Sequence, residues 1–156
     1  MKFDDLDAKM RAYEMARDPS ALPGVFLVAR IDGRSFTRLT KEIMNYEPPY
    51  DERFPVAMVA TVEHLMSCGF QVVFGYTQSD EISLLFGRDE NSFGRNVRKW
   101  TSILAGEASA AFAVRIAHVA AFDCRVIELP TESLVIDYFR WRSEDAHRNA
   151  LNAWCY

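Results

Sequence analysis

The sequence predicts an α+β fold of the ferredoxin-like type, with the strand and helix order βαββαβ and flanking helices. Three observations support this prediction. The continuous apolar run VFLVARI (25–31) is typical of a buried central strand. The segments QVVFGY (71–76) and EISLLF (81–86) are separated only by TQSD, which predicts a hairpin. Apolar residues at helical spacing precede and follow this hairpin, so helices are expected to connect the strands.

Each element has a local signal. The turn-forming sequence DPSALPG ends a first amphipathic helix, and Gly69 is placed to end the helix before the hairpin. A loop containing Glu47-Pro48-Pro49 precedes that helix. In chain order the predicted elements are a helix at 3–13, a strand at 25–31, a short helical stretch at 36–43, a helix near 54–67, strands at 71–76 and 81–86, a long helix from Asn91 or Ser92 to Ala113, a strand at 118–129, and a final helix from Thr131 or Ser133.

Composition bounds the class of protein. At 156 residues, 49% of them hydrophobic, the chain is long enough for one domain with a real core. No uncharged segment reaches the length that a membrane span requires. The cysteines Cys68, Cys124 and Cys155 have no CxxC spacing, so we expect reduced thiols in a cytoplasmic protein. A net charge of −4 argues against indiscriminate nucleic-acid binding, although RNVRK (95–99) is either a local basic path or a solvated helix face.

Three acids converge on one end of the predicted sheet. In this topology the first and third strands are antiparallel neighbours, so the end of VFLVARI lies beside the start of EISLLF. Asp32 therefore lies next to Asp80 and Glu81. Carboxylates at close range raise one another's pKa values and call for a cation. Mg²⁺ fits, because it takes few protein oxygens and completes its shell with waters and substrate phosphates.

The backbone after Asp32 suits the phosphate side of such a site. Gly33 permits close approach of a ligand. The amides of Arg34, Ser35 and Phe36 are expected at a helix start, where N–H groups bind anions. Neither a P-loop nor a GxGxxG motif occurs. The simpler alternative is that Asp-Gly is a common turn after a strand and SDE a hairpin tip, and the residues alone leave both interpretations open.

Four long motifs, in the correct order, resemble the tRNA-His guanylyltransferase superfamily. They are RIDGRSFTRLT, GYTQSDEISLLF, FDCR and DYFRWRSEDAHRNALN, and they span nearly the whole chain. The chain is similar in particular to the bacterial and archaeal-type branch. The resemblance implies a polymerase-like palm that uses GTP, ATP and Mg²⁺ to add nucleotides to the 5′ end of tRNA in the 3′-to-5′ direction.

The resemblance also implies roles for single residues. Two metal ions are implied at Asp32, the carbonyl oxygen of Gly33 and Asp80, with Glu81 as a neighbouring catalytic acid. The implied nucleotide-binding residues are Asp32, Gly33, Arg34, Ser35, Phe36, Thr37, Ser79, Asp80, Arg95, Lys99, Arg125, His147 and Asn152.

Within this set the basic and polar residues have separate implied tasks. Arg95, Lys99 and Arg125 are implied to hold triphosphate, and His147 and Asn152 to handle the activated 5′ end. Arg95 and Lys99 are nearly as typical of surface helix charges, and His147 alone would be read as an ordinary exposed or core histidine. Arg125 lies on a predicted strand, where an inward guanidinium needs an anion.

One position departs from the family. The eukaryotic branch carries a lysine before the proline of the loop after DGR, whereas this chain carries Glu47. The departure favours templated repair of tRNAs that lack 5′ nucleotides over untemplated addition of one guanosine. Two other functions stay open, namely an RNA-binding ferredoxin-like module without catalysis and a palm-type nucleotide cyclase.

We expect residues 1–156 to form a single palm domain, with residues 131–156 as the start of a C-terminal helical extension. The sequence HRNALNAWCY ends without a helix-terminating signal, and family members usually continue further, so we expect a shortened form. The resemblance implies a homo-oligomer, a tetramer in the full-length family.

Overall fold

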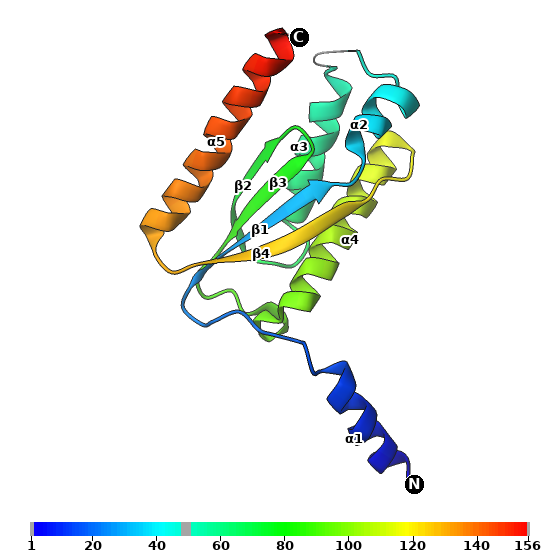
Figure 1. Cartoon of the computed structure of the whole chain (residues 1–156), viewed down its shortest axis with the longest axis vertical. Coiled ribbons are helices and arrows are strands. Elements are labelled where there is room, and N and C mark those ends of the chain that lie inside the picture. The colour runs from blue at the N-terminus through cyan, green and yellow to red at the C-terminus, as the bar shows by residue number, and fades with distance from the viewer. Residues whose placement is uncertain (1, 48–50, 156) are drawn as a thin grey trace.

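The apolar runs of the sequence form the centre of an antiparallel sheet. The structure is a computed structural model that describes residues 2–47 and 51–155. Its strands are β1 (Phe26–Gly33), β2 (Val72–Gln78), β3 (Glu81–Phe86) and β4 (Phe122–Leu129), in the spatial order β2-β3-β1-β4. The most apolar strands, β1 and β3, are thus the central pair. The predicted ferredoxin-like α+β order is confirmed (Figure 1).

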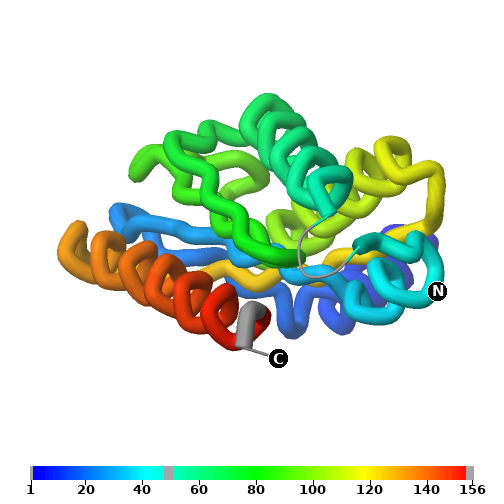
Figure 2. Tube along the Cα trace, turned by 90° about the horizontal axis from the view of Figure 1, so that it is seen from above, coloured from blue at the N-terminus to red at the C-terminus, as the bar shows by residue number. Residues whose placement is uncertain are grey.

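Helices cover both faces of the sheet. α3 (Arg53–Leu65) and α4 (Val97–Ile116) lie on one face, and α5 (Glu132–Cys155) lies on the other (Figure 2). α1 (Phe3–Glu14) stands away from this body and contains no buried residue (Figure 1). α2 (Phe36–Arg38) continues into a π-helical turn at 39–43. Within the described residues, no helix combines the length and apolarity that crossing a bilayer requires.

The main core lies between the sheet and the layer formed by α3 and α4. Successive side chains of a strand face opposite sides, so alternate residues of β1 and β3 point into this core. The opposite face of the same strands carries charged residues and lies beneath α5. The buried core residues of the two central strands and of α3 and α4 include Leu27, Ala29, Ile31, Met58, Val62, Leu65, Ile82, Leu84, Phe86, Trp100, Leu104, Ala108 and Phe112.

The hairpin turn is shorter than predicted. Gln78 still pairs with Glu81, so the turn consists of Ser79 and Asp80 rather than TQSD. Ser79 has a φ of 48°, a left-handed conformation that a tight turn of this length requires. The turn fixes Asp80 directly beside the first residue of β3.

Other boundaries also differ from the prediction. The long helix begins at Val97, because Asn96 caps it by accepting a hydrogen bond from the Lys99 amide at 2.9 Å. The last strand begins at Phe122 rather than at residue 118. The predicted start of α5 is confirmed, since Glu132 is its first residue. Residues 48–50 of the predicted loop lie outside the described residues.

Candidate active site

The ends of β1 and β3 bring the predicted acids together. Asp32 and Glu81 are partners across the two strands, and the Gly33 amide donates a hydrogen bond to the Asp80 carbonyl oxygen at 3.0 Å. The predicted neighbourhood of Asp32, Asp80 and Glu81 is therefore confirmed. Main-chain contacts set the spacing of these acids.

Asp80 is a half-buried acid in an unfavourable environment. Burial is the largest cause that raises the pKa of its carboxyl group above the ordinary value. Hydrogen bonds from its own amide and from the Ser79 hydroxyl, at 3.1 Å, lower it, and the charges of Asp32 and Glu81 raise it further. A cation beside Asp80 would remove the penalty on the ionised form.

Asp32 and Asp80 fit a magnesium site that takes further ligands from its substrate. In the described parts of the chain, neither carboxylate has a basic side chain as an ion-pair partner, and no three His, Cys, Asp or Glu side chains are grouped to hold a metal ion. Mg²⁺ commonly binds through one or two carboxylates, waters and substrate phosphates. The two acids, with the Gly33 carbonyl oxygen, are a donor set of this kind.

Glu81 already has cationic partners from its own chain. Its carboxylate lies 2.6 Å from Arg30 Nη2 of β1 and 3.0 Å from Arg142 Nη1 of α5. Arg30 and Glu81 lie on the sheet face that α5 covers, and Arg142 reaches Glu81 from α5. Glu81 is buried there. The structure thus brings Glu81 to the predicted site, but its charge is compensated by two arginines and needs no metal ion.

Gly33 and Phe36 build the loop that follows Asp32. A Cβ atom at Gly33 would lie 2.5 Å from a ring atom of Phe36, so the position has no room for a side chain. The Phe36 ring is buried, with centroids 5.2 Å from Phe112 and 4.9 Å from Phe122. The Phe36 side chain therefore anchors the loop in the core, and only its backbone is available to a ligand.

The amides of this loop are not all available to an anion. The Arg34 amide donates to the Ala121 carbonyl oxygen at 2.8 Å, which corrects the prediction that it points at a phosphate. Ser35 is exposed in a left-handed conformation with φ of 60°, and Thr37 is exposed. Ser35 and Thr37 therefore stay candidate contacts, together with the exposed side chain of Arg34.

Two arginines lie on the same sheet face as Asp32. Arg30 and Arg125 are partners across β1 and β4, as are Asp32 and Asp123. The Arg125 side chain is 57% exposed, and its one ion pair among the described residues is a long contact of 3.9 Å with Asp123. The structure therefore leaves Arg125 open to an anion near Asp32. Arg30 is not among the predicted site residues, although its position two residues before Asp32 predicts that both face the same side.

Arg95 and Lys99 lie at the other end of the sheet. The buried Arg95 guanidinium donates to the Val25 carbonyl oxygen at 2.9 Å, just before β1 begins. Lys99 is exposed in the first turn of α4, next to Trp100, which packs on Phe86 at the far end of β3. The structure therefore does not bring Arg95 or Lys99 to Asp32, and the triphosphate contact of both stays a prediction.

His147 and Asn152 project from α5. Both are exposed, and both follow Arg142, which binds Glu81. The helix is the element that carries them toward the carboxylate end of the sheet (Figure 1). No contact in the described residues links either of them to Asp32 or Asp80.

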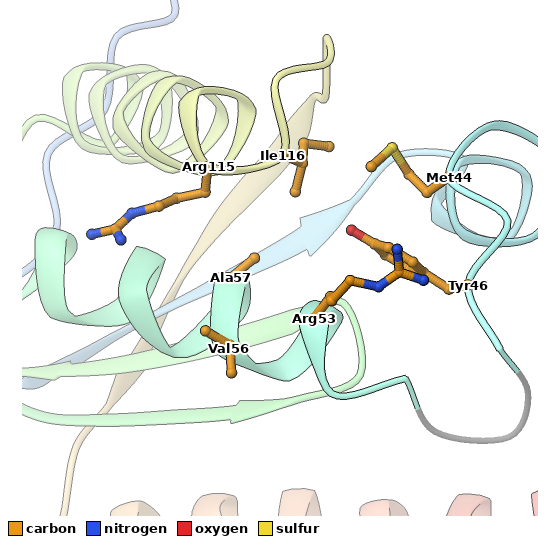
Figure 3. A pocket seen from close by; sticks show the side chains of 7 residues that line it. All are labelled: Met44, Tyr46, Arg53, Val56, Ala57, Arg115 and Ile116. Atoms are coloured by element: carbon orange, nitrogen blue, oxygen red, sulfur yellow. The ribbon is translucent and has the colours of Figure 1, made fainter.

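A separate hollow of about 380 Å³ lies on the other side of the sheet, between the start of α3 and the end of α4 (Figure 3). The Arg53 guanidinium lies 4.8 Å from the centroid of the Tyr46 ring and 2.6 Å from Asp51. Figure 3 shows the Arg115 side chain directed away from this pair. The lining residues are Met44, Tyr46, Arg53, Val56, Ala57, Arg115 and Ile116.

Comparisons with known proteins match most of this chain. The sequence profile of Thg1, described as tRNAHis guanylyltransferase, matches residues 7–130. The chain is 32% identical over 143 residues to the probable tRNA(His) guanylyltransferase of Drosophila melanogaster, and 30% identical over 141 residues to that of Mus musculus. These alignments cover 86% and 85% of this chain but 50% and 47% of the relatives. The chain thus spans about half the length of these relatives.

Two solved structures, both described as a bacterial tRNA(His) guanylyltransferase (Thg1)-like protein, are similar in fold. One is a bacterial tRNA(His) guanylyltransferase (Thg1)-like protein in complex with GTP, with a TM-score of 0.89 and 29% identity over 97% of this chain and 70% of that chain. The other is described in complex with ATP, with a TM-score of 0.87 and 29% identity over 95% of this chain and 68% of that chain. The fold, the motifs and the profile match agree: the chain belongs to the tRNAHis guanylyltransferase (Thg1) family.

Proposed function

We propose that this chain is the palm of a Mg²⁺-dependent nucleotidyltransferase that adds nucleotides to the 5′ end of tRNA in the 3′-to-5′ direction. The observation that carries the proposal is the juxtaposition of Asp32 and Asp80, two acids without a basic partner in the described residues. Arg125 stands open on the same sheet face as Asp32. Family membership and the GTP- and ATP-bound neighbours support nucleoside triphosphates as substrates.

In the proposed reaction, the 3′-hydroxyl of a bound nucleoside triphosphate attacks the 5′ phosphorus of a tRNA activated as an adenylate or a triphosphate. The new bond joins the 3′ oxygen to phosphorus, the bond to AMP or pyrophosphate breaks, and the hydroxyl proton passes to water. Mg²⁺, when bound, lowers the pKa of the hydroxyl group and neutralises the leaving group. Asp32 and Asp80 supply oxygen ligands, while Arg125 neutralises phosphate charge.

The test of this proposal is the removal of each acid. Asp32→Ala and Asp80→Ala are expected to lower the rate of nucleotide addition at least about 100-fold, because groups that stabilise transition-state charge contribute on this scale. Extension of a labelled tRNA measures the rate, and circular dichroism checks the fold. Asp89→Ala, at an exposed acid beyond the far end of β3, is the matched control. Full activity of either acid variant contradicts the proposal.

We further propose that addition is templated and repairs tRNAs that lack 5′ nucleotides. The support is Glu47, an exposed acid in the loop where the eukaryotic branch carries a lysine. The test offers each nucleoside triphosphate separately to a tRNA shortened by one 5′ nucleotide. Incorporation of the complementary nucleotide alone is expected, and equal use of all four rejects the repair role.

Two other functions are separated from this proposal by simpler assays. Incubation with GTP and Mg²⁺ without RNA yields a cyclic nucleotide only if the palm is a cyclase. An RNA-binding module without catalysis retains tRNA in a binding assay but consumes no nucleotide. The acids without a basic partner in the described residues favour catalysis over the binding module, and membership of the Thg1 family favours the transferase over the cyclase.

A further inference from the structure

α5 is attached to β3 by two polar side chains. The Tyr138 hydroxyl lies 3.1 Å from the Ser83 hydroxyl. The Arg142 guanidinium donates to both carboxylate oxygens of Glu81, at 3.2 and 3.0 Å. Arg30 of β1 binds Glu81 from the other side at 2.6 Å. The helix is therefore tied to both central strands through one buried carboxylate.

The two attachments follow one register. Tyr138 and Arg142 are separated by about 6 Å along an α-helix, and Ser83 and Glu81 by about 6.6 Å along a strand. The two spacings nearly match, and the later helix residue contacts the earlier strand residue, so α5 runs antiparallel to β3 and toward the carboxylate end of the sheet (Figure 1). Two more residues back along the chain from Glu81, the same spacing that separates Ser83 from Glu81, is Ser79 at the tip of the hairpin.

Beyond Arg142 the helix has little support from the sheet. Tyr138 and Arg142 are buried, whereas none of the described side chains of α5 that follow Arg142 is buried. His147 and Asn152 lie on this half, about 7.5 Å and about 15 Å past Arg142 along the helix axis. A small change of helix direction at Arg142 therefore displaces Asn152 further than it displaces Arg142 itself.

We propose that Arg142 is a positioning residue, which through its ion pair with Glu81 fixes the direction of α5 relative to Asp32 and Asp80 and so places the tRNA 5′ end. This inference rests on the function proposed above. The Arg142 side chain is 4% exposed, and its guanidinium also lies 3.6 Å from Asp145 and 3.5 Å from the centroid of the Trp141 ring. In this arrangement Glu81 anchors a helix and is not a metal ligand.

The experiment compares Arg142→Met with Arg140→Met. Arg140 is a matched control on the same helix, because it is exposed and pairs with Glu144 at 2.8 Å. With saturating GTP and Mg²⁺, Arg142→Met is expected to lower the rate of tRNA extension about 10- to 100-fold, since a displacement of about 1 Å costs on this scale. Its affinity for GTP with Mg²⁺ is expected to stay within threefold of wild type, and Arg142→Lys to recover part of the rate.

Glu81 provides the second half of the test. Glu81→Gln is expected to reduce extension as Arg142→Met does, and the double variant to be no worse than the more severe single one, because both remove the same contact. A loss of Mg²⁺ affinity in Glu81→Gln that Arg142→Met does not share overturns the anchoring role. Wild-type extension by Arg142→Met, or an equal loss of GTP affinity and extension, also overturns it.

Hydrogen–deuterium exchange tests the anchor without activity. Amides of residues 143–153 are expected to exchange faster in Arg142→Met and in Arg142→Lys, in that order, and to be unchanged in Arg140→Met. Unchanged exchange in the Arg142 variants overturns the anchor. If wild-type protein extends no tRNA, the proposed function fails, while the exchange result still decides whether Arg142 holds α5.

Discussion

The two ends of the central strands β1 and β3 differ in how their buried or half-buried charged groups are paired. At the Val25 end, the Arg95 guanidinium donates to backbone carbonyl oxygens of Val25, Arg88 and Glu90, at 2.9 to 3.3 Å. At the other end, Asp80 is half-buried with two acids as neighbours, and the pKa of its carboxyl group is raised. Both Nη atoms of the Arg95 guanidinium have backbone acceptors, although its Nε atom has no partner among the described residues. The Asp80 carboxylate has no basic partner in the same residues.

This difference separates a structural charge from a functional one. A buried charge that its own chain satisfies stabilises one conformation. A charge kept in an unfavourable environment indicates a ligand that relieves it, which is why strained ionisable groups cluster at functional sites. Glu81 shows that proximity to the site is not sufficient, because it lies beside Asp80 and is still satisfied by Arg30 and Arg142.

The largest effect on stability is expected at the end of the sheet where Arg95 lies, far from Asp80. Arg95→Met removes the guanidinium donor from three carbonyl oxygens in buried or partly buried contacts, so the free energy of unfolding is expected to fall by about 2–4 kcal/mol. Urea denaturation measures it. The control Arg98→Met removes a surface pair with Asp18 at 3.0 Å, and solvent screens such a pair, so a much smaller loss of stability is expected. Equal losses in the two variants would contradict a structural role for Arg95.

The next effect is expected at Gly33, where the carboxylate end is tightly packed. Gly33→Ala forces a Cβ against the Phe36 ring, so the free energy of unfolding is expected to fall by about 1–3 kcal/mol. The control Gly106→Ala places its Cβ in open space within α4, where it is expected to stabilise the helix by about 0.5–1 kcal/mol. Thermal melting measures both variants. Shifts of the melting temperature in opposite directions support the packing argument, and shifts in the same direction contradict it.

Nucleotide affinity is expected to distinguish the two ends. Arg125→Ala is expected to weaken GTP binding about tenfold, or about 1.4 kcal/mol, because Arg125 stands open on the Asp32 face. Lys99→Ala, at the other end, is expected to change affinity less than twofold. Isothermal titration calorimetry with Mg²⁺ measures both. A larger loss of GTP affinity in Lys99→Ala than in Arg125→Ala would indicate that the nucleotide binds at the Lys99 end of the sheet.

The smallest effect is expected from neutralising Asp80. Its raised pKa means that the folded state binds a proton more readily than the unfolded state, so stability is lost as pH rises from the ordinary Asp value through the raised one. Above this window, without divalent ions, Asp80→Asn is expected to be more stable than wild type by about 0.5–1 kcal/mol. Below it the difference should vanish. A less stable Asp80→Asn at neutral pH would contradict an unfavourable environment for the ionised Asp80 carboxylate.

Local patterns were sufficient to predict the strands and the meeting of the acids. VFLVARI and EISLLF are long apolar runs, and the order of elements places Asp32 beside Asp80 once the ferredoxin-like topology is assumed. The cap of α4 was misplaced because Asn91, Ser92 and Asn96 have similar capping chemistry. Only the local hydrogen bond from the Lys99 amide to the Asn96 side chain, three residues earlier, shows which of them is the cap.

The position of Arg95 and Lys99 away from Asp32 follows from the order of the elements. β3 runs away from Asp80, so the helix that follows it must begin at the far end of the sheet; the predicted topology already contained this consequence. The partners of Glu81 were harder to find, since Arg142 is 61 positions away and only packing of α5 on the sheet brings them together. Local periodicity carries no information on a contact of this kind.

The hydrogen bond from the Gly33 amide to the Asp80 carbonyl oxygen joins the two acidic segments without using a side chain. Donor atoms at this position can therefore be exchanged while their spacing is retained. Replacing one carboxylate by imidazole changes the hardness of the donor set, and imidazole suits zinc, copper, iron or nickel while carboxylate suits magnesium, calcium or manganese. The tie between β1 and the hairpin thus makes this end of the sheet a scaffold on which metal preference can be redesigned.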